Sequence, residues 1–234
     1  MTFSGQGVQQ FIARHTPEPI RQFVRERRWA RDVDASMREL LALGPGVVPP
    51  PALLRRIREA WGNEGFAARP EYVNEVARLA AVAEGAILEC GTGLTTLVLA
   101  AVAGRRNVGV YSLEHDAAWA ARVDERLAAV GLKRSVLLAP LVNYDGYGWY
   151  QPPAAISQLK FRLVVCDGPP GDTPGGRYGL LPRMKKQLVP GAIILLDDAL
   201  RESEQLVLRR WLTEGCGILE PRSAAPTYAL VTYQ

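Results

Sequence analysis

The chain has 234 residues, of which 22% are charged, and a formal net charge of +4. This length suffices for one α/β domain with a real hydrophobic core. No apolar stretch approaches the roughly 20 residues that span a bilayer, and the first residues lack the charged and apolar regions of a signal peptide. The three cysteines show no metal-ligand spacing, so we expect them to be reduced core residues. These features predict a compact cytoplasmic protein without a membrane partner.

The excess positive charge lies in the first 70 residues, which hold 11 arginines and 7 acidic residues. Five of the arginines fall between positions 21 and 31, with apolar and aromatic residues among them, as on a surface that binds phosphate or nucleic acid. Acidic residues are interspersed, however, and this mixture is more typical of a solvated helix face. A nucleic-acid partner is therefore not expected.

A linker rich in proline and glycine, residues 44–51, punctuates the N-terminal part of the chain. Helices are predicted around it at 19–43, 52–61 and 70–83. We divide the chain into residues 1–70, a helical segment, and residues 71–234, a separate domain, and the plainest role of the N-terminal helices is to pack against the rest of the fold.

The most informative motif is an apolar strand, starting at Ile87, that runs through Glu89 and breaks into Gly91 and Gly93. Glycine lets the backbone turn sharply after a strand and lie against a ligand, and the apolar run 94–102 offers a helix N-terminus there. The third glycine of a dinucleotide fingerprint is missing. The motif therefore predicts a nucleotide-cofactor loop and argues against a pyrophosphate.

A second acidic signal follows at a suitable distance. The predicted strand 108–113 ends in Glu114, and a carboxylate about 20 residues past the glycines can accept hydrogen bonds from both hydroxyls of a ribose. His115 and Asp116 then open a predicted helix that Gly131 closes. A solvated strand end is the alternative interpretation of Glu114.

Together these motifs resemble those of class I S-adenosylmethionine-dependent methyltransferases, and similar segments occur in uncharacterised bacterial members. The segment Glu89–Gly93 matches the first motif of that family, and Glu114 matches its ribose-binding acid. The resemblance implies that Glu89, Gly91 and Gly93 surround the amino-acid half of S-adenosylmethionine, and that His115 lies by the adenine.

Beyond Gly85 the sequence alternates between strands and helices, which predicts a doubly wound α/β fold. Strands are expected at 86–90, 108–113, 134–139, 161–167 and 191–197, and residues 216–220 and 227–233 are expected to form an antiparallel hairpin. The resemblance implies a mostly parallel, seven-stranded, Rossmann-like sheet with one reversed strand. It also implies that residues 1–70 form a helical cap or lid over the active site, and that residues 71–234 form the S-adenosylmethionine-binding methyltransferase domain.

Two of the predicted strands end in carboxylates, Asp167 after one and the pair Asp197 and Asp198 after the other. Ligands of open α/β sheets bind at the carboxyl ends of strands, and neighbouring strands lie about 4.8 Å apart, so these acids should converge. Unpaired carboxylates so close repel one another, unless some bind protons or a cation lies among them. Mg²⁺ suits such an all-oxygen site.

The three acids also match the metal ligands of catechol-type and sugar O-methyltransferases, which implies metal ligation by Asp167, Asp197 and Asp198 and catalytic roles for Asp167 and Asp197. The catechol-type enzymes have a lysine shortly after the first acid, whereas this chain has a turn of proline and glycine, which leaves the base open. The alternative is that the acids only cap a turn and a helix.

Two further features remain open at this level. Arg177, near the start of the helix after the fourth strand, can reach an anionic substrate or the clustered acids, or can lie on the surface. The aromatic segment 144–150 can line the adenine pocket, stack on a substrate ring or pack at the sheet edge.

The sequence thus predicts methyl transfer from S-adenosylmethionine to a hydroxyl oxygen of a small molecule or sugar, with Mg²⁺ or another divalent cation as a second candidate cofactor. An NAD-dependent oxidoreductase and a non-catalytic binding protein on the same scaffold are the alternatives. An RNA or base-amine substrate is disfavoured, because no Asn-Pro-Pro-aromatic motif follows the fourth strand.

Overall fold

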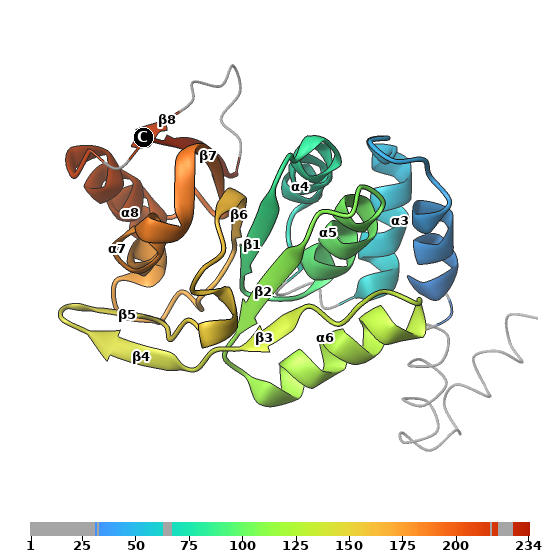
Figure 1. The fold of residues 1–234 in the computed structure, drawn as a ribbon, viewed down its shortest axis with the longest axis horizontal. Coiled ribbons are helices and arrows are strands. Elements are labelled where there is room, and N and C mark those ends of the chain that lie inside the picture. The colour runs from blue at the N-terminus through green and yellow to red at the C-terminus, as the bar shows by residue number, and fades with distance from the viewer. Residues whose placement is uncertain (1–30, 32, 63–66, 216, 220–226) are drawn as a thin grey trace, which may run out of the picture.

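The computed structural model describes residues 31, 33–62, 67–215, 217–219 and 227–234. Within these ranges the chain forms an α/β fold with helices on both faces of a central sheet (Figure 1). No helix in the described ranges is both long enough and apolar enough to cross a membrane.

The described residues form a central sheet of seven strands in the order β3-β2-β1-β6-β7-β9-β8. The strands are β1 (Ala86–Cys90), β2 (Val110–Glu114), β3 (Val136–Leu138), β6 (Phe161–Cys166), β7 (Leu188–Leu196), β8 (Gly217–Leu219) and β9 (Ala229–Tyr233). Strands β3, β2, β1, β6 and β7 are parallel, and β9 runs antiparallel to both β7 and β8. The predicted doubly wound sheet and its antiparallel ending are confirmed.

The central strands are apolar because both of their faces are covered. Ile87 and Val165 pack with the helices on one face, whereas Leu88 and Val164 belong to the core on the other. All four side chains have no exposed surface. The continuous apolar runs in the sequence therefore mark the strands that carry the site at their carboxyl ends.

One face is covered by α4 (Pro70–Val82), α5 (Leu94–Gly104) and α6 (Ala117–Ala129), with α3 (Pro51–Trp61) packed outside them (Figure 1). Prolines occupy the first positions of α3 and α4, where a missing N–H costs nothing. Helical residues 33–41 join this layer, and the Arg105 guanidinium, just past α5, donates to the carbonyl oxygens of Leu40 and Val47.

The cap role of residues 1–70 stays a prediction. The described part of this segment packs alongside the helical layer, and Trp61 at the end of α3 makes an edge contact with Trp119 of α6 at 6.2 Å between ring centroids. Residues 1–30, 32 and 63–66 lie outside the described residues. They include about half of the predicted helix 19–43 and four of the five arginines clustered between positions 21 and 31.

The opposite face carries α7 (Leu180–Met184), α8 (Glu202–Thr213) and a hairpin of β4 (Leu141–Tyr144) and β5 (Tyr147–Tyr150). The hairpin replaces the aromatic loop expected at 144–150. Its turn is Asp145-Gly146, with Gly146 at φ +79°, and an Asp-Gly pair between apolar residues is a strong hairpin signal. That signal was present in the sequence.

Candidate cofactor loop and acid cluster

The loop after β1 requires glycine at position 91 for two reasons. Gly91 has φ +83°, and a Cβ there would lie 2.8 Å from the backbone nitrogen of Gly168. Gly168 follows β6, and its N–H donates to the carbonyl of Cys90 at 2.6 Å. The loops that end β1 and β6 therefore touch through backbone atoms, which joins the predicted cofactor loop to the acid cluster.

Gly93 differs from Gly91, because its backbone is extended at φ 167° and a Cβ there would meet no atom within 4 Å. Gly93 is the N-cap of α5, and its N–H donates to Thr96 Oγ1 at 2.9 Å. The space beside this glycine is thus open at a helix N-terminus, as the predicted cofactor loop requires.

Glu89 lies on β1 with no exposed surface, and neither carboxyl oxygen has a hydrogen-bond partner in the described structure. Burial raises the pKa of Glu89 to about 7, although the nearby hydroxyls of Ser112, Thr95 and Thr96 favour its ionised form. A buried carboxylate without a cationic partner is costly, and a cationic ligand would relieve that cost.

Glu114, at the end of β2, lies 4% exposed beside the same loop. Its Oε2 accepts from the N–H and hydroxyl of Thr92 at 3.2 and 2.7 Å, and its Oε1 accepts from the N–H groups of His115 and Asp116 at 2.7 and 2.9 Å. The His115 imidazole Nδ1 lies 2.9 Å from Oε1, and its ring centroid lies 6.4 Å from that of Tyr150. The structure thus gathers Glu89, Glu114 and His115 around the glycine loop.

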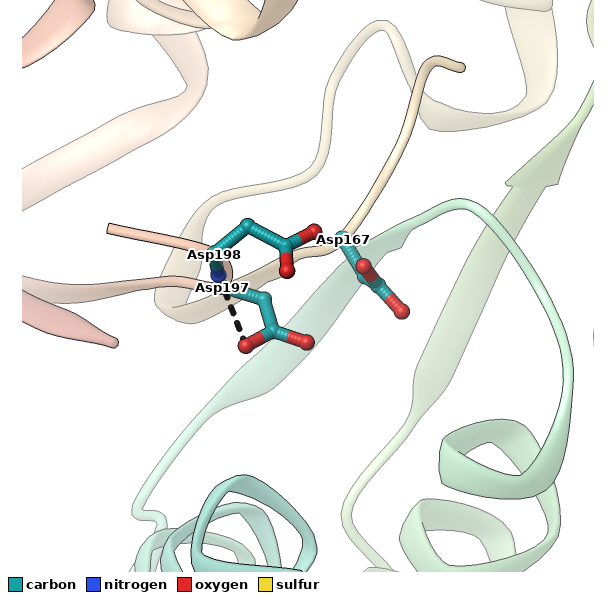
Figure 2. A group of neighbouring side chains, drawn as sticks. All are labelled: Asp167, Asp197 and Asp198. Atoms are coloured by element: carbon teal, nitrogen blue, oxygen red, sulfur yellow. Dashed lines mark hydrogen bonds between the residues drawn. The ribbon is translucent and has the colours of Figure 1, made fainter. Parts of the chain in front are cut away.

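The three acids of the second predicted group also converge, with potential ligand oxygens within 4.8 Å of one another. Figure 2 shows Asp197 and Asp198 at the end of β7 and Asp167 at the end of β6, and the Asp198 N–H donates to Asp197 Oδ1 at 2.8 Å. Burial raises the pKa of Asp197 to about 7, and the charge of Asp167 adds to this effect. Burial likewise raises the pKa of Asp167, which Arg177 opposes.

The cation among these acids is Arg177, whose role the sequence left open. Its guanidinium is buried, and Nη2 lies 3.1 Å from both Asp167 Oδ1 and Asp198 Oδ2. It also binds the carbonyl oxygens of Asp167 and Asp197 and lies 3.5 Å from the buried Glu204 carboxylate. Burial alone would lower the pKa of Arg177, but these acids, Asp167 foremost, raise it above its ordinary value. Arg177 thus ties together the ends of β6 and β7.

The capping alternative is not what the described structure shows. The N-cap of α8 is Arg201, without a side-chain cap, and the Asp198 carboxylate instead pairs with the Arg201 guanidinium at 2.8 Å. Asp198 itself adopts φ +55°, an uncommon conformation for a residue other than glycine. Backbone strain of this kind clusters at functional sites.

The cluster can still accommodate a divalent cation. Asp167 Oδ2, Asp197 Oδ2 and Asp198 Oδ1 accept no hydrogen bond from the described part of the chain, so each acid keeps one oxygen for a ligand. With Glu204 there are four carboxylates against the two guanidiniums of Arg177 and Arg201, which leaves an excess of two negative charges when all are ionised. Oxygen ligands with that excess charge suit Mg²⁺.

The aromatic hairpin mostly serves packing. Tyr147 stacks on Tyr144 at 5.5 Å and meets Tyr178 edge-on at 5.2 Å, and a Cβ at Gly179 would overlap Trp149. Tyr150 is the exception, because its hydroxyl lies so close to Gly168 that a Cβ there would overlap it. Of the aromatic residues considered for the site, Tyr150 is the one next to the touching loops.

The sheet order, the reversed β9 and the site at the carboxyl ends of β1, β2, β6 and β7 define the Rossmann-like fold of class I S-adenosylmethionine-dependent methyltransferases. Among solved structures, the chain resembles an O-methyltransferase from Bacillus cereus in complex with S-adenosylhomocysteine. The TM-score is 0.54 at 13% identity, over 80% of this chain and 93% of that one.

Two other solved structures have similar scores. CalS11, a TDP-rhamnose 3′-O-methyltransferase of calicheamicin biosynthesis, matches with TM-score 0.52 and 16% identity over 86% of this chain and 93% of that one. A methyltransferase from Geobacter sulfurreducens matches with TM-score 0.53 and 15% identity over 100% and 98%. At sequence identities this low, the comparison shows that the chain shares the fold of these proteins. No family model matches the chain, and no curated protein matches its sequence.

Proposed function

We propose that this chain is an S-adenosylmethionine-dependent methyltransferase acting on a hydroxyl oxygen of a small molecule or sugar. The observation that carries the proposal is Glu89, a fully buried carboxylate at the start of the glycine loop, whose ionised form is favoured by the hydroxyls of Ser112, Thr95 and Thr96 and not by a neighbouring cation. The amino-acid half of S-adenosylmethionine carries an ammonium group that can donate to this carboxylate and balance its charge. NAD offers no such group in its place.

Each residue of the site has a role in this proposal. Glu89 holds the ammonium group, Gly91 and Gly93 let the chain lie close to the cofactor, Glu114 binds the ribose, and His115 lies by the adenine. S-adenosylmethionine supplies a methyl group on a sulfonium, which is already reactive. The contribution of the protein is therefore mainly proximity and alignment of donor and acceptor.

Asp167 and Asp197 are the residues we assign to the acceptor. Their carboxylates lie at the ends of adjacent strands, and each keeps an oxygen that can accept a hydrogen bond from a hydroxyl group. Those oxygens orient the acceptor hydroxyl and can take its proton, in the absence of the lysine that catechol-type enzymes use. Resemblance in fold to two O-methyltransferases supports oxygen as the acceptor atom.

When a cation binds, the same oxygens of Asp167 and Asp197, together with the free oxygen of Asp198, would hold Mg²⁺ or a similar cation in place of the direct contact with the acceptor hydroxyl. A bound cation supplies Lewis-acid chemistry, since it lowers the pKa of a hydroxyl that ligates it. Arg177 and Arg201 fix the remaining oxygens of Asp167 and Asp198 and keep the cluster assembled.

The test is calorimetric titration of the cofactor-stripped protein with S-adenosylmethionine, in MgCl₂ and in chelator, with NAD as a second ligand. We expect saturable micromolar binding of S-adenosylmethionine and none of NAD. The control variant is Gly93→Ala, which leaves the fold intact because nothing opposes its Cβ, but places a methyl group in the proposed cofactor space. Binding of NAD alone, or full cofactor affinity in Gly93→Ala, would contradict the proposal.

A further inference from the structure

The carboxylate assigned to the ribose is already fully occupied by the chain itself. A carboxylate accepts about four hydrogen bonds, two at each oxygen. Glu114 accepts four, from the N–H and hydroxyl of Thr92 at Oε2 and from the N–H groups of His115 and Asp116 at Oε1. The His115 imidazole Nδ1 also lies 2.9 Å from Oε1, so Oε2 is the less crowded oxygen. A ribose therefore gains its hydrogen bonds here only if one of these donors leaves.

The four donors are not equally free to leave. Three are backbone N–H groups, and withdrawing them requires the chain to move. The Thr92 segment is held in place from other sides, because Trp119 Nε1 donates to the Thr92 carbonyl at 2.9 Å and the Gly93 N–H donates to Thr96 Oγ1 at 2.9 Å. The fourth donor is the Thr92 hydroxyl, which leaves by rotation about one side-chain bond.

The Thr92 hydroxyl also makes the shortest contact to Oε2, at 2.7 Å, a distance typical of a strong hydrogen bond to an ionised acceptor. Glu114 is 4% exposed, so water competes little for it. This internal hydrogen bond therefore opposes any ligand that needs the same oxygen.

We infer that the Thr92 hydroxyl is an internal competitor of the cofactor ribose: it occupies Glu114 Oε2 in the free protein, is displaced on binding, and so weakens cofactor affinity and eases product release. This inference rests on the proposed function. It concerns the strength of cofactor binding, whereas the proposed function concerns which cofactor binds.

The test compares Thr92→Ala and Thr92→Val, which lack the hydroxyl, with Thr92→Ser, which keeps it. S-adenosylhomocysteine is the probe, titrated calorimetrically into each stripped protein. We expect the Ala and Val variants to bind about three- to tenfold more tightly, the gain from removing one competing hydrogen bond to a charged group. Thr92→Ser returns the affinity towards the wild-type value.

A second readout separates competition from a merely structural role. The free Ala and Val variants should melt at a lower temperature than the wild type, because they lose a hydrogen bond, and yet bind the ligand more tightly. The gain should appear with adenosine and vanish with 2′,3′-dideoxyadenosine, which lacks both ribose hydroxyls. A structural role would lower stability and affinity together.

Two outcomes overturn the inference in different ways. If the wild type binds S-adenosylhomocysteine but Thr92→Ala and Thr92→Val bind equally well or more weakly, the hydroxyl is no competitor and only the inference fails. If no variant binds S-adenosylhomocysteine, the proposed function fails and the inference falls with it.

Discussion

Replacement of Arg177 by methionine tests how the acid cluster is held together. The guanidinium is buried and lies within 3.5 Å of Asp167, Asp198 and Glu204, so its removal leaves several carboxylates without their counter-ion. Breaking a buried ion pair from one side costs about 3–5 kcal/mol. The matched control is Arg201→Met, because Arg201 binds the same oxygen of Asp198 with its side chain 57% exposed. An exposed pair of this kind contributes at most about 1 kcal/mol.

The assay is urea unfolding of the wild type and both variants at pH 8 and pH 5. At pH 8 we expect the free energy of unfolding to fall by about 3–5 kcal/mol in Arg177→Met and by at most about 1 kcal/mol in Arg201→Met. The Arg177→Met loss should shrink at pH 5, because Asp197, whose pKa is raised to about 7, then carries a proton and less charge is left uncompensated. Similar losses for the two variants, or a loss for Arg177→Met independent of pH, would refute the reasoning.

Three further predictions follow from the site. Glu89 binds its proton more tightly in the fold than in the unfolded chain, so it stabilises the fold below its ordinary pKa and loses this contribution as the pH rises through about 7. Between pH 5 and pH 8, the free energy of unfolding of Glu89→Gln should therefore rise by up to about 3 kcal/mol relative to that of the wild type. If the two proteins lose stability in parallel over this range, the pKa of Glu89 is not raised by folding. Gly91→Ala should lower the melting temperature sharply, unlike Gly93→Ala, because its Cβ meets the Gly168 backbone; equal melting of the two variants would count against the loop contact. Asp197→Asn should weaken Mn²⁺ binding by about tenfold or more and leave the affinity for S-adenosylhomocysteine unchanged. Electron paramagnetic resonance measures the Mn²⁺ affinity, and an unaltered value would show that Asp197 is not a metal ligand.

The fold could be predicted from sequence because its signals are local. Apolar runs such as Leu163–Cys166 mark buried parallel strands, and glycine marks the sharp turn at position 91, so β1 and β6 begin where they were expected. Strand β7 starts at Leu188, three residues before the predicted start, and includes Pro190 and Gly191, where a φ of +81° at Gly191 and a shift in register against β6 mark an irregularity. The aromatic hairpin was not predicted, although its turn, Asp145-Gly146, is a local hairpin signal.

The candidate site was predictable in its members but not in its pairing. The sequence placed Asp167, Asp197 and Asp198 together, and their convergence is what the structure shows. It left their pairing with Arg177 open, because nothing in Gly-Gly-Arg-Tyr distinguishes Arg177 from a surface arginine. Its burial depends on contacts with strand ends and with Glu204, which lie 10 to 27 residues away in the chain. Such long-range pairing has no local signature.

The contact between Gly91 and Gly168 gives the site a fixed internal length. Side chains change rotamer and helices slide, but two backbones in van der Waals contact cannot approach further, and the hydrogen bond from the Gly168 N–H to the Cys90 carbonyl resists their separation. Backbone contacts therefore set the distance between the cofactor loop and Asp167. Mutations in the surrounding segments can change which acceptor fits the site, while the distance between the cofactor loop and the acid cluster stays the same.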